Sequence, residues 1–121
     1  MSPIMNRHIT ILEDDIDIRE LCSYILSEEG YQVQSYGDIA SFTANAKKSD
    51  LFLLDIRLPD GNGLELCDQL KKDQRFSKIP IIMMSAHQRG TSAMLGSRAD
   101  DFIEKPFDIH YLLQRVARLL H

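Results

Sequence analysis

The stretch LFLLDIRLPDGNG, residues 51–63, carries the strongest indication of the fold, because a run of large apolar residues ends on an aspartate and enters a loop with proline and two glycines. Four consecutive apolar residues are typical of a strand that is buried on both faces of a parallel sheet. A lone charge is costly to remove from water. We therefore expect Asp55 either to lie at an exposed strand end or to bind a partner.

Short apolar runs alternate along the chain with segments of helical period, which predicts a parallel α/β sheet built from five strand–helix units. Apolar side chains at helical spacing indicate helices over residues 18–26, 64–70 and 109–120. Gly30 ends the first, while Asn62 and Asp108 are suited to cap the other two. A weaker helix is expected over Ile39–Ala46, and a short or mobile one within Gln88–Ser97, where glycine, serine and threonine are frequent. The expected strands are His8–Glu13, Tyr31–Tyr36, Leu51–Asp55, Ile79–Met84 and Asp101–Glu104.

The composition of the 121 residues, 44% hydrophobic and 26% charged, is that of a single globular domain. We expect residues 1–6 to be an N-terminal extension and residues 7–121 to form the domain. Cys22 and Cys67 lie in expected helices and are interpreted as buried core residues. The net charge of −4 and the lack of a basic block argue against direct contact with nucleic acid. The chain shows no membrane-length apolar run and no signal peptide, so a cytoplasmic location is expected.

Polar residues stand at the end of four expected strands, where parallel α/β sheets bind their ligands. They are the acidic run at residues 13–15, Asp55, Ser85 and Lys105. Clustered carboxylates repel one another and must take up protons or recruit a cation, and Mg²⁺ accepts carboxylates, a backbone carbonyl and waters. An aspartate beside such an ion can attack a phosphoryl group, with Lys105 and Ser85 supplying a charge and a hydroxyl donor. This arrangement predicts that Asp55 forms an aspartyl phosphate.

Each of these residues also has a simpler interpretation when it is taken alone. Asp55 could be a turn residue, residues 13–15 could be a solvated helix start, and Lys105 could be an ordinary loop lysine. Their occurrence at four strand ends of one sheet favours a common site.

The motifs ILEDD, LFLLDIRLPDGNGLEL, MMSA and ADDFIEKPF, in this order, resemble the receiver domain of two-component response regulators, the CheY-like superfamily. The resemblance covers the chain from about Arg7 to Leu120. It implies a doubly wound (βα)5 fold with the flavodoxin-like strand order 2-1-3-4-5. It also implies a signalling domain that catalyses only its own phosphorylation and dephosphorylation, and is not a turnover enzyme.

The resemblance assigns roles to single residues. It implies that Asp55 is the phosphoacceptor, that Lys105 pairs with the phosphoryl group, and that Ser85 and Phe102 form a switch. Phe102 could alternatively be a plain core aromatic. The implied Mg²⁺ ligands are Glu13, Asp14, Asp55 and the backbone carbonyl of Arg57.

Two side chains are expected to influence the lifetime of the phosphoryl group. Arg57 and His87 each lie two positions beyond a site residue, Asp55 and Ser85 respectively. Receiver domains carry side chains over the site at these positions. His87 could equally be a loop histidine without a role.

The resemblance implies a sensor histidine kinase or a histidine phosphotransfer protein as the phosphodonor. An output domain or a target protein would read the face built from the fourth helix, fifth strand and fifth helix, where phosphorylation would also allow a dimer. Two departures from the family pattern affect this face: Ser85 and Lys105 are only 20 positions apart, and Arg98 stands where glycine is common.

Two other classes of function remain open from the sequence. One is a phosphate-independent docking module of the same fold. The other is a small Mg²⁺-dependent phosphatase of the haloacid-dehalogenase type, whose nucleophile lies in a D-x-D pair after the first strand. Asp15 and Asp17 form such a pair, but they lie past the strand and enter the helix.

Overall fold

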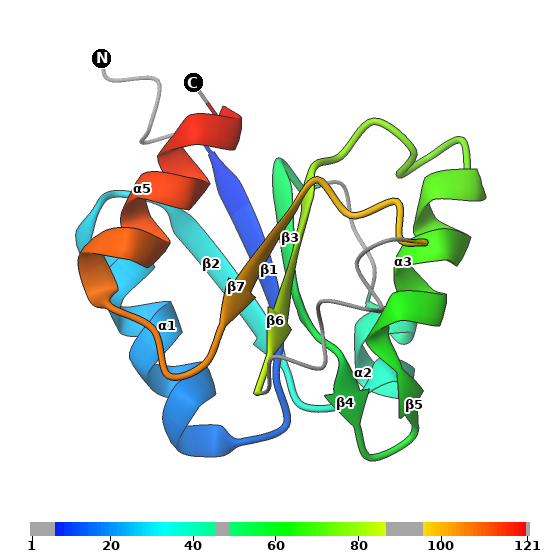
Figure 1. Ribbon diagram of the computed structural model, residues 1–121, viewed down its shortest axis with the longest axis horizontal. Coiled ribbons are helices and arrows are strands. Elements are labelled where there is room, and N and C mark those ends of the chain that lie inside the picture. Colours follow the sequence, from blue (N-terminus) through cyan, green and yellow to red (C-terminus); the bar gives the residue numbers. More distant parts are fainter. Residues whose placement is uncertain (1–6, 46–48, 87–95, 121) are drawn as a thin grey trace.

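A five-stranded parallel sheet forms the centre of the molecule in the computed structural model, which describes residues 7–45, 49–86 and 96–120 (Figure 1). Its strands follow the order β2-β1-β3-β6-β7, and each neighbouring pair is parallel. This is the predicted flavodoxin-like order 2-1-3-4-5, which is confirmed. The strands are β1 (His8–Leu12), β2 (Gln32–Tyr36), β3 (Leu51–Asp55), β6 (Ile81–Ser85) and β7 (Asp101–Glu104).

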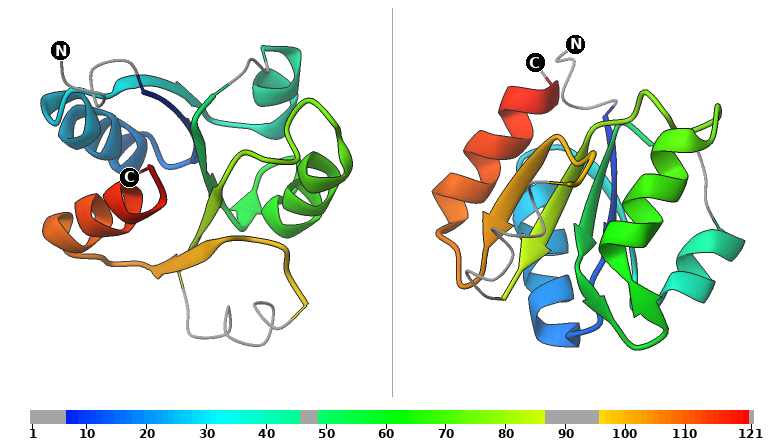
Figure 2. Two further views of the ribbon diagram at one scale, coloured as in Figure 1. Left: turned by 90° about the horizontal axis from the view of Figure 1, so that it is seen from above. Right: turned by 45° about the vertical axis from the view of Figure 1, so that its right-hand side comes forward.

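Helices cover both faces of the sheet. Figure 2 shows α1 (Ile16–Glu28) and α5 (Ile109–Leu120) on one face, and α2 (Ile39–Ala44) and α3 (Gly63–Lys72) on the other. The core accordingly has two layers. Leu51 and Leu53 of β3 pack in the layer with α1 and α5, whereas Phe52 and Leu54 pack in the layer with α2 and α3. Because β3 is buried on both faces, its sequence is a continuous apolar run and does not alternate.

Helix ends follow local capping chemistry. Asn62 Oδ1 accepts a hydrogen bond from the Leu64 N–H at 2.7 Å, and Asp108 Oδ1 accepts one from the His110 N–H at 2.7 Å, as predicted. At the end of α1, Gly30 adopts a φ of 102°, which a residue without a side chain tolerates. The N–H groups of Gly30 and Tyr31 then donate to the carbonyls of Ser27 and Leu26, which completes a Schellman cap.

The structure shifts several predicted boundaries. β1 ends at Leu12, so Glu13 follows the strand and is not part of it; β2 begins at Gln32 and not at Tyr31. β6 starts after Pro80, which has no N–H to donate to the ladder, and it includes Ser85. α2 ends at Ala44, with Asn45 as its C-cap, and Ala46 lies outside the described residues.

Two short elements were not predicted. β4 (Arg57–Leu58) and β5 (Gly61–Asn62) form an antiparallel hairpin directly after Asp55. Most of the predicted helix within 88–97 lies outside the described residues. No helix in the described part of the chain is both long and apolar enough to span a bilayer.

Candidate functional site

The four polar strand ends meet at one edge of the sheet, at the lower end of Figure 1. Asp55 is the last residue of β3, and Glu13 and Asp14 directly follow β1. One carboxylate oxygen from each of these three residues lies within 4.8 Å of the others. Such close carboxylates form a strongly negative site.

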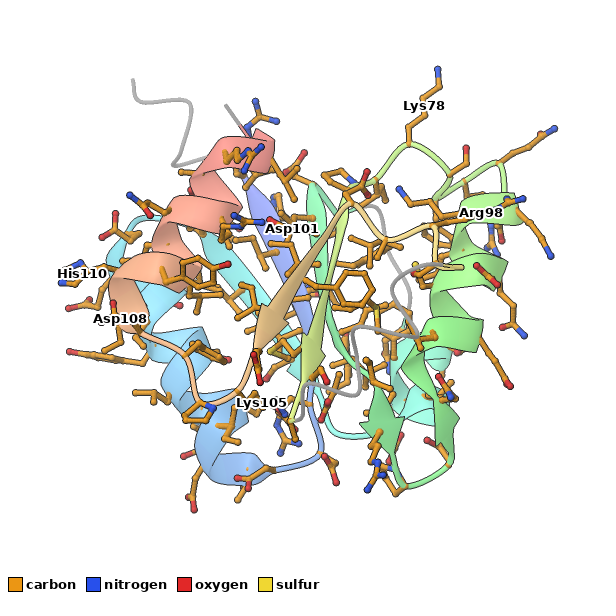
Figure 3. All side chains as sticks on the ribbon, in the orientation of Figure 1. Lys78, Arg98, Asp101, Lys105, Asp108 and His110 are labelled. Atoms are coloured by element: carbon orange, nitrogen blue, oxygen red, sulfur yellow. The ribbon has the colours of Figure 1, made fainter. Side chains whose placement is uncertain are left out.

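Lys105 supplies the positive charge of this cluster, and Figure 3 shows it at the end of β7. Its Nζ donates to Asp55 Oδ2 at 3.1 Å and makes a short bond to Glu13 Oε1. Its backbone N–H donates to the Ser85 carbonyl at 2.7 Å, which places it beside the end of β6. The lysine therefore joins residues from three strand ends.

Burial governs the electrostatics of the cluster. Glu13 is fully buried and Asp55 is 5% exposed, whereas Asp14 is exposed. Burial raises the pKa of Glu13, and the hydrogen bond from Lys105 opposes only part of that rise. Burial also disfavours the charged form of Lys105, but the bonds to Glu13 and Asp55 outweigh it and raise the pKa of Lys105. Lys105 is therefore a firmly protonated cation at neutral pH.

The donor set fits a hard divalent cation. All three groups are carboxylates, and in their ionised forms they leave two negative charges uncompensated by Lys105. Mg²⁺ prefers oxygen ligands and keeps several waters, which suits a site that is buried on one side and open at Asp14.

Gly63, at the start of α3, lies close against the backbone of Asp55. Its N–H donates to the Ile56 carbonyl at 2.7 Å, and a Cβ added there would overlap the Asp55 carbonyl oxygen. Sequence reasoning treated this glycine as part of a loop and missed its role. The GNG motif is the only signal that could have drawn attention to it.

The loop after β3 is also tied to α2. The two carboxylate oxygens of Asp60 accept hydrogen bonds from the N–H groups of Ile39 and Ala40, at 2.8 and 2.9 Å. These N–H groups belong to the first turn of the helix and have no partner within it. Asp60 therefore anchors the hairpin that follows Asp55.

The remaining predicted site residues lie around this cluster. Ser85 ends β6 and is partly buried. Phe102 in β7 is partly buried and packs against the core layer of α2 and α3. Arg57 begins β4 two residues after Asp55, with an exposed side chain. His87 lies outside the described residues.

The alternative D-x-D pair is used differently. Asp15 Oδ1 accepts hydrogen bonds from the N–H groups of Asp17 and Ile18, so it caps α1. Neither Asp15 nor Asp17 belongs to the carboxylate cluster. The pair is thus explained by helix capping.

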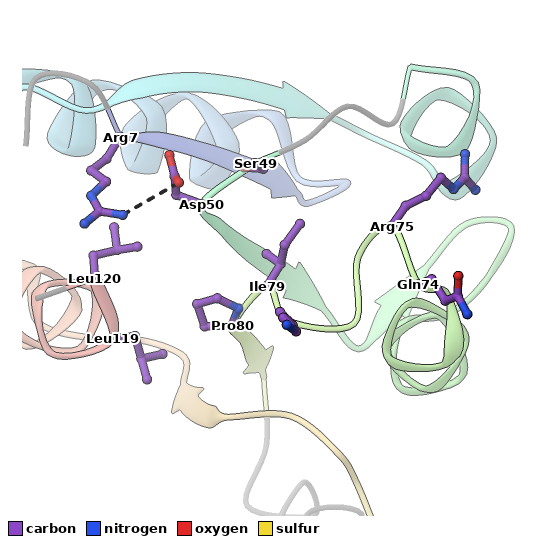
Figure 4. Close-up of a pocket in the computed structure, with 10 residues that line it drawn as sticks. Arg7, Ser49, Asp50, Gln74, Arg75, Ile79, Pro80, Leu119 and Leu120 are labelled. Carbon is purple, nitrogen blue, oxygen red and sulfur yellow. Dashed lines mark ion pairs between the residues drawn. The ribbon is translucent and has the colours of Figure 1, made fainter.

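A pocket of about 390 Å³ lies at the opposite edge of the sheet, where the strands begin (Figure 4). Both arginines that line it are paired with nearby carboxylates. Arg7 pairs with Asp50 at 3.7 Å, and Arg75 pairs with Asp73 at 2.8 Å. In Figure 4 the side chains of Arg7 and Arg75 point in different directions.

Comparisons with known proteins agree with this geometry. The response regulator receiver domain family matches residues 9–117. The chain is 37% identical over 118 residues to the transcriptional regulatory protein GltR of Pseudomonas aeruginosa, which covers 94% of the chain and 49% of GltR. It is 33% identical over 121 residues to the phosphate regulon transcriptional regulatory protein PhoB of Escherichia coli, which covers 96% of the chain and 52% of PhoB. The chain therefore spans about half the length of these relatives.

Solved structures show the same fold. The signal receiver domain of a signal transduction histidine kinase from Syntrophus aciditrophicus matches with a TM-score of 0.84 and 32% identity, over 94% of this chain and 89% of that one. The response regulator protein TrrA from Thermotoga maritima matches with a TM-score of 0.83 and 29% identity, over 94% and 99% of the two chains. Phosphorylation and dependence on Mg²⁺ are general in receiver domains. The chain belongs to the receiver domain family of two-component response regulators.

Proposed function

We propose that this receiver domain accepts a phosphoryl group on Asp55 from the phosphohistidine of a sensor histidine kinase or a histidine phosphotransfer protein. The observation that carries the proposal is the cluster itself: Lys105 Nζ lies 3.1 Å from Asp55 Oδ2, beside the carboxylates of Glu13 and Asp14. Phosphoryl transfer mainly requires alignment and neutralisation of charge, which this arrangement can supply.

In the proposed reaction, a carboxylate oxygen of Asp55 attacks the phosphorus, and the bond from phosphorus to the imidazole nitrogen of the donor breaks. Lys105 then pairs with a phosphoryl oxygen, and the Ser85 hydroxyl donates to another. Bound by Glu13, Asp14, Asp55 and the Arg57 carbonyl, Mg²⁺ would neutralise part of the phosphoryl charge. The complex of TrrA with Mg²⁺-BeF supports the choice of metal.

Signalling would follow from a change at the neighbouring strands. Phe102 lies opposite Met83 in the β6–β7 ladder, on the strand next to Ser85. We propose that Ser85 moves toward the new phosphoryl oxygens and that Phe102 turns into the space it leaves. This would shift the population of two packings of the face that includes β7 and α5.

We propose that an output domain or a target protein binds that face. GltR and PhoB are transcriptional regulatory proteins, which supports output through gene regulation in a longer protein. Because its net charge is −4, we do not propose that this chain itself binds nucleic acid. A phosphorylation-dependent dimer through the same face belongs to this proposal.

Arg57 and His87 are proposed to influence how long the phosphoryl group persists. Arg57 has an exposed side chain two residues beyond Asp55. A polar side chain there can screen or orient the attacking water. Alanine at either position would then change the rate at which phosphate is lost, and unchanged rates would contradict the role.

The proposal is tested by intact mass after incubation with acetyl phosphate, with and without Mg²⁺. We expect wild type to gain one phosphoryl group only when Mg²⁺ is present, and Asp55→Asn to gain none. Asp17→Asn is the matched control, because it neutralises an exposed aspartate outside the cluster and should still be labelled. Absence of an adduct on wild type that binds Mg²⁺ would instead indicate a phosphate-independent docking module. Loss of the adduct in Asp17→Asn would favour the D-x-D pair.

A further inference from the structure

Arg19 of α1 connects the two loops that flank the acidic cluster. Its Nη1 donates to the backbone carbonyl of Glu13 at 2.9 Å. Its guanidinium also lies over Gly37, the first residue after β2, where an added Cβ would overlap Nη1. Arg19 thus occupies the space that a side chain at position 37 would take.

Position 37 requires glycine because a larger side chain would overlap Arg19, and not because of its backbone conformation. Among the described residues, only Gly30 has a positive φ, so the backbone of Gly37 has a conformation that alanine also adopts. The atom in the way is the far end of a flexible side chain. Alanine at position 37 would therefore displace the guanidinium at little cost to the fold.

The hydrogen bond from Arg19 lies next to Asp14, the carboxylate of the cluster with the fewest contacts to hold it in place. Glu13 and Asp55 are both bonded to Lys105, whereas the side chain of Asp14 is exposed and shows no hydrogen bond within the described residues. The carbonyl of Glu13 belongs to the peptide group that leads into Asp14. On the other side, the Glu13 N–H donates to the Tyr36 carbonyl at 3.0 Å. Arg19 therefore completes the set of bonds that fixes the backbone carrying Asp14.

We propose that Arg19 is a positioning residue for the divalent cation, acting through the Glu13 backbone on Asp14, and that Gly37 leaves the room this requires. The inference rests on the proposed function, because it assumes that the acidic cluster binds Mg²⁺. Groups that orient metal ligands from outside the ligand set typically affect metal affinity by about 10–100-fold.

When Arg19 is replaced, the loss of its charge and the loss of its hydrogen bond are expected to change Mg²⁺ affinity in opposite directions. Arg19 Nη1 bonds to the Glu13 carbonyl beside the cluster, so removing its positive charge would by itself strengthen Mg²⁺ binding, because the site becomes more negative. Loss of a positioning bond weakens binding. Gly37→Ala changes no charge at all, so it tests the geometry alone.

The test measures Mg²⁺ affinity by isothermal titration calorimetry, alongside the melting temperature in EDTA. The variants are Arg19→Met, Gly37→Ala and the double variant. Arg75→Met is the matched control, because it removes an exposed arginine whose carboxylate partner, Asp73, is outside the cluster. We expect each single variant to bind Mg²⁺ about tenfold more weakly than wild type. We expect the double variant to match Arg19→Met, since the overlap at position 37 disappears with the guanidinium, and the control to match wild type.

The melting temperature in EDTA shows whether a variant is destabilised, independently of its affinity for Mg²⁺. Gly37→Ala should melt in EDTA at the wild-type temperature, so its weaker Mg²⁺ binding cannot be ascribed to unfolding, and it decides the question if Arg19→Met does not fold. Unchanged or tighter Mg²⁺ binding in Gly37→Ala would overturn the inference, as would additive losses in the double variant. If wild type binds no Mg²⁺, the proposed cation site itself fails, and this inference fails with it.

Discussion

Lys105 places one positive charge between two buried carboxylates, so the negative charge of the site is partly neutralised. The bonds to Glu13 and Asp55 offset the cost of burying these charges. Asp14 has no such partner within the described residues and is left exposed. Burial and the bonds to Lys105 therefore distinguish Glu13 and Asp55 from the neighbouring Asp14.

Adding a methyl group at Gly63 is expected to lower the stability of the fold. In Gly63→Ala the new Cβ would overlap the Asp55 carbonyl oxygen, which is backbone and cannot turn aside. We expect the free energy of unfolding to fall by about 1–3 kcal/mol, as for other overpacked sites, when measured by urea denaturation. Gly96→Ala is the control, since no atom of the described residues lies within 4 Å of a Cβ added there. Equal stability of the two variants would contradict the assigned contact.

Cys22 is expected to be chemically inert in the folded protein. It is fully buried, and burial raises its thiol pKa from 9.0 to about 11. At pH 8 roughly one thiol in a thousand would then be ionised, and the thiolate is the reactive form. Labelling with a thiol reagent at pH 8 should be slow for the native protein and fast in urea. Rapid native labelling at Cys22, located by peptide mass analysis, would show that the thiol is accessible.

At the scale of elements, the segment between β3 and α3 is held from two sides. Gly63 ties its end to Ile56, and Asp60 ties its middle to the first turn of α2. The β4–β5 hairpin between these points therefore has little freedom to move away from Asp55.

Removing the Asp60 carboxylate should loosen α2. Asp60→Ala leaves the N–H groups of Ile39 and Ala40 without their acceptors, which for a helix cap costs about 1 kcal/mol. We expect a lower free energy of unfolding and faster hydrogen exchange at these two amides. Glu20→Ala, an exposed position on α1, should stay within about 0.5 kcal/mol of wild type. Unaltered exchange at Ile39 and Ala40 would show that the cap is not formed in solution.

The elements differ in how far they could be predicted. β3 and the caps of α3 and α5 were predicted correctly, because an apolar run and capping side chains are local signals. The bounds of β7 were also predicted correctly, although it contains only two apolar residues. The β4–β5 hairpin was missed because strands of two residues carry no periodicity.

At the scale of the whole molecule, the strand order brings residues from four parts of the chain to one sheet edge. Lys105 is 92 positions from Glu13 and 50 from Asp55, yet it bonds to both. A ligand that binds this edge therefore links distant segments and should stabilise the entire fold.

Mg²⁺ should raise the stability of the domain. At a free concentration ten times its Kd, a cation that binds only the folded state adds about 1.4 kcal/mol to the free energy of unfolding. We expect the melting temperature to rise with Mg²⁺, to return to its original value with EDTA, and to respond little in Asp14→Asn. The same rise with Na⁺ at equal ionic strength would point to general screening of the acidic cluster.

The sequence by itself determined the fold class, the strand order implied by the family motifs, and which acidic, basic and hydroxyl residues stand at the strand ends. The fold class and the strand-end residues follow from local apolar runs and polar positions. The strand order follows from the resemblance that the motifs carry, and the comparisons confirm that family. Only the tertiary structure decided that Glu13 is fully buried while Asp14 is exposed, and that Lys105 bonds to Glu13 as well as to Asp55. It alone placed Arg19 over Gly37 and Asp60 on α2. Such contacts join residues that are distant along the chain or that carry no periodic signal, so they exist only once the sheet and its helices have packed.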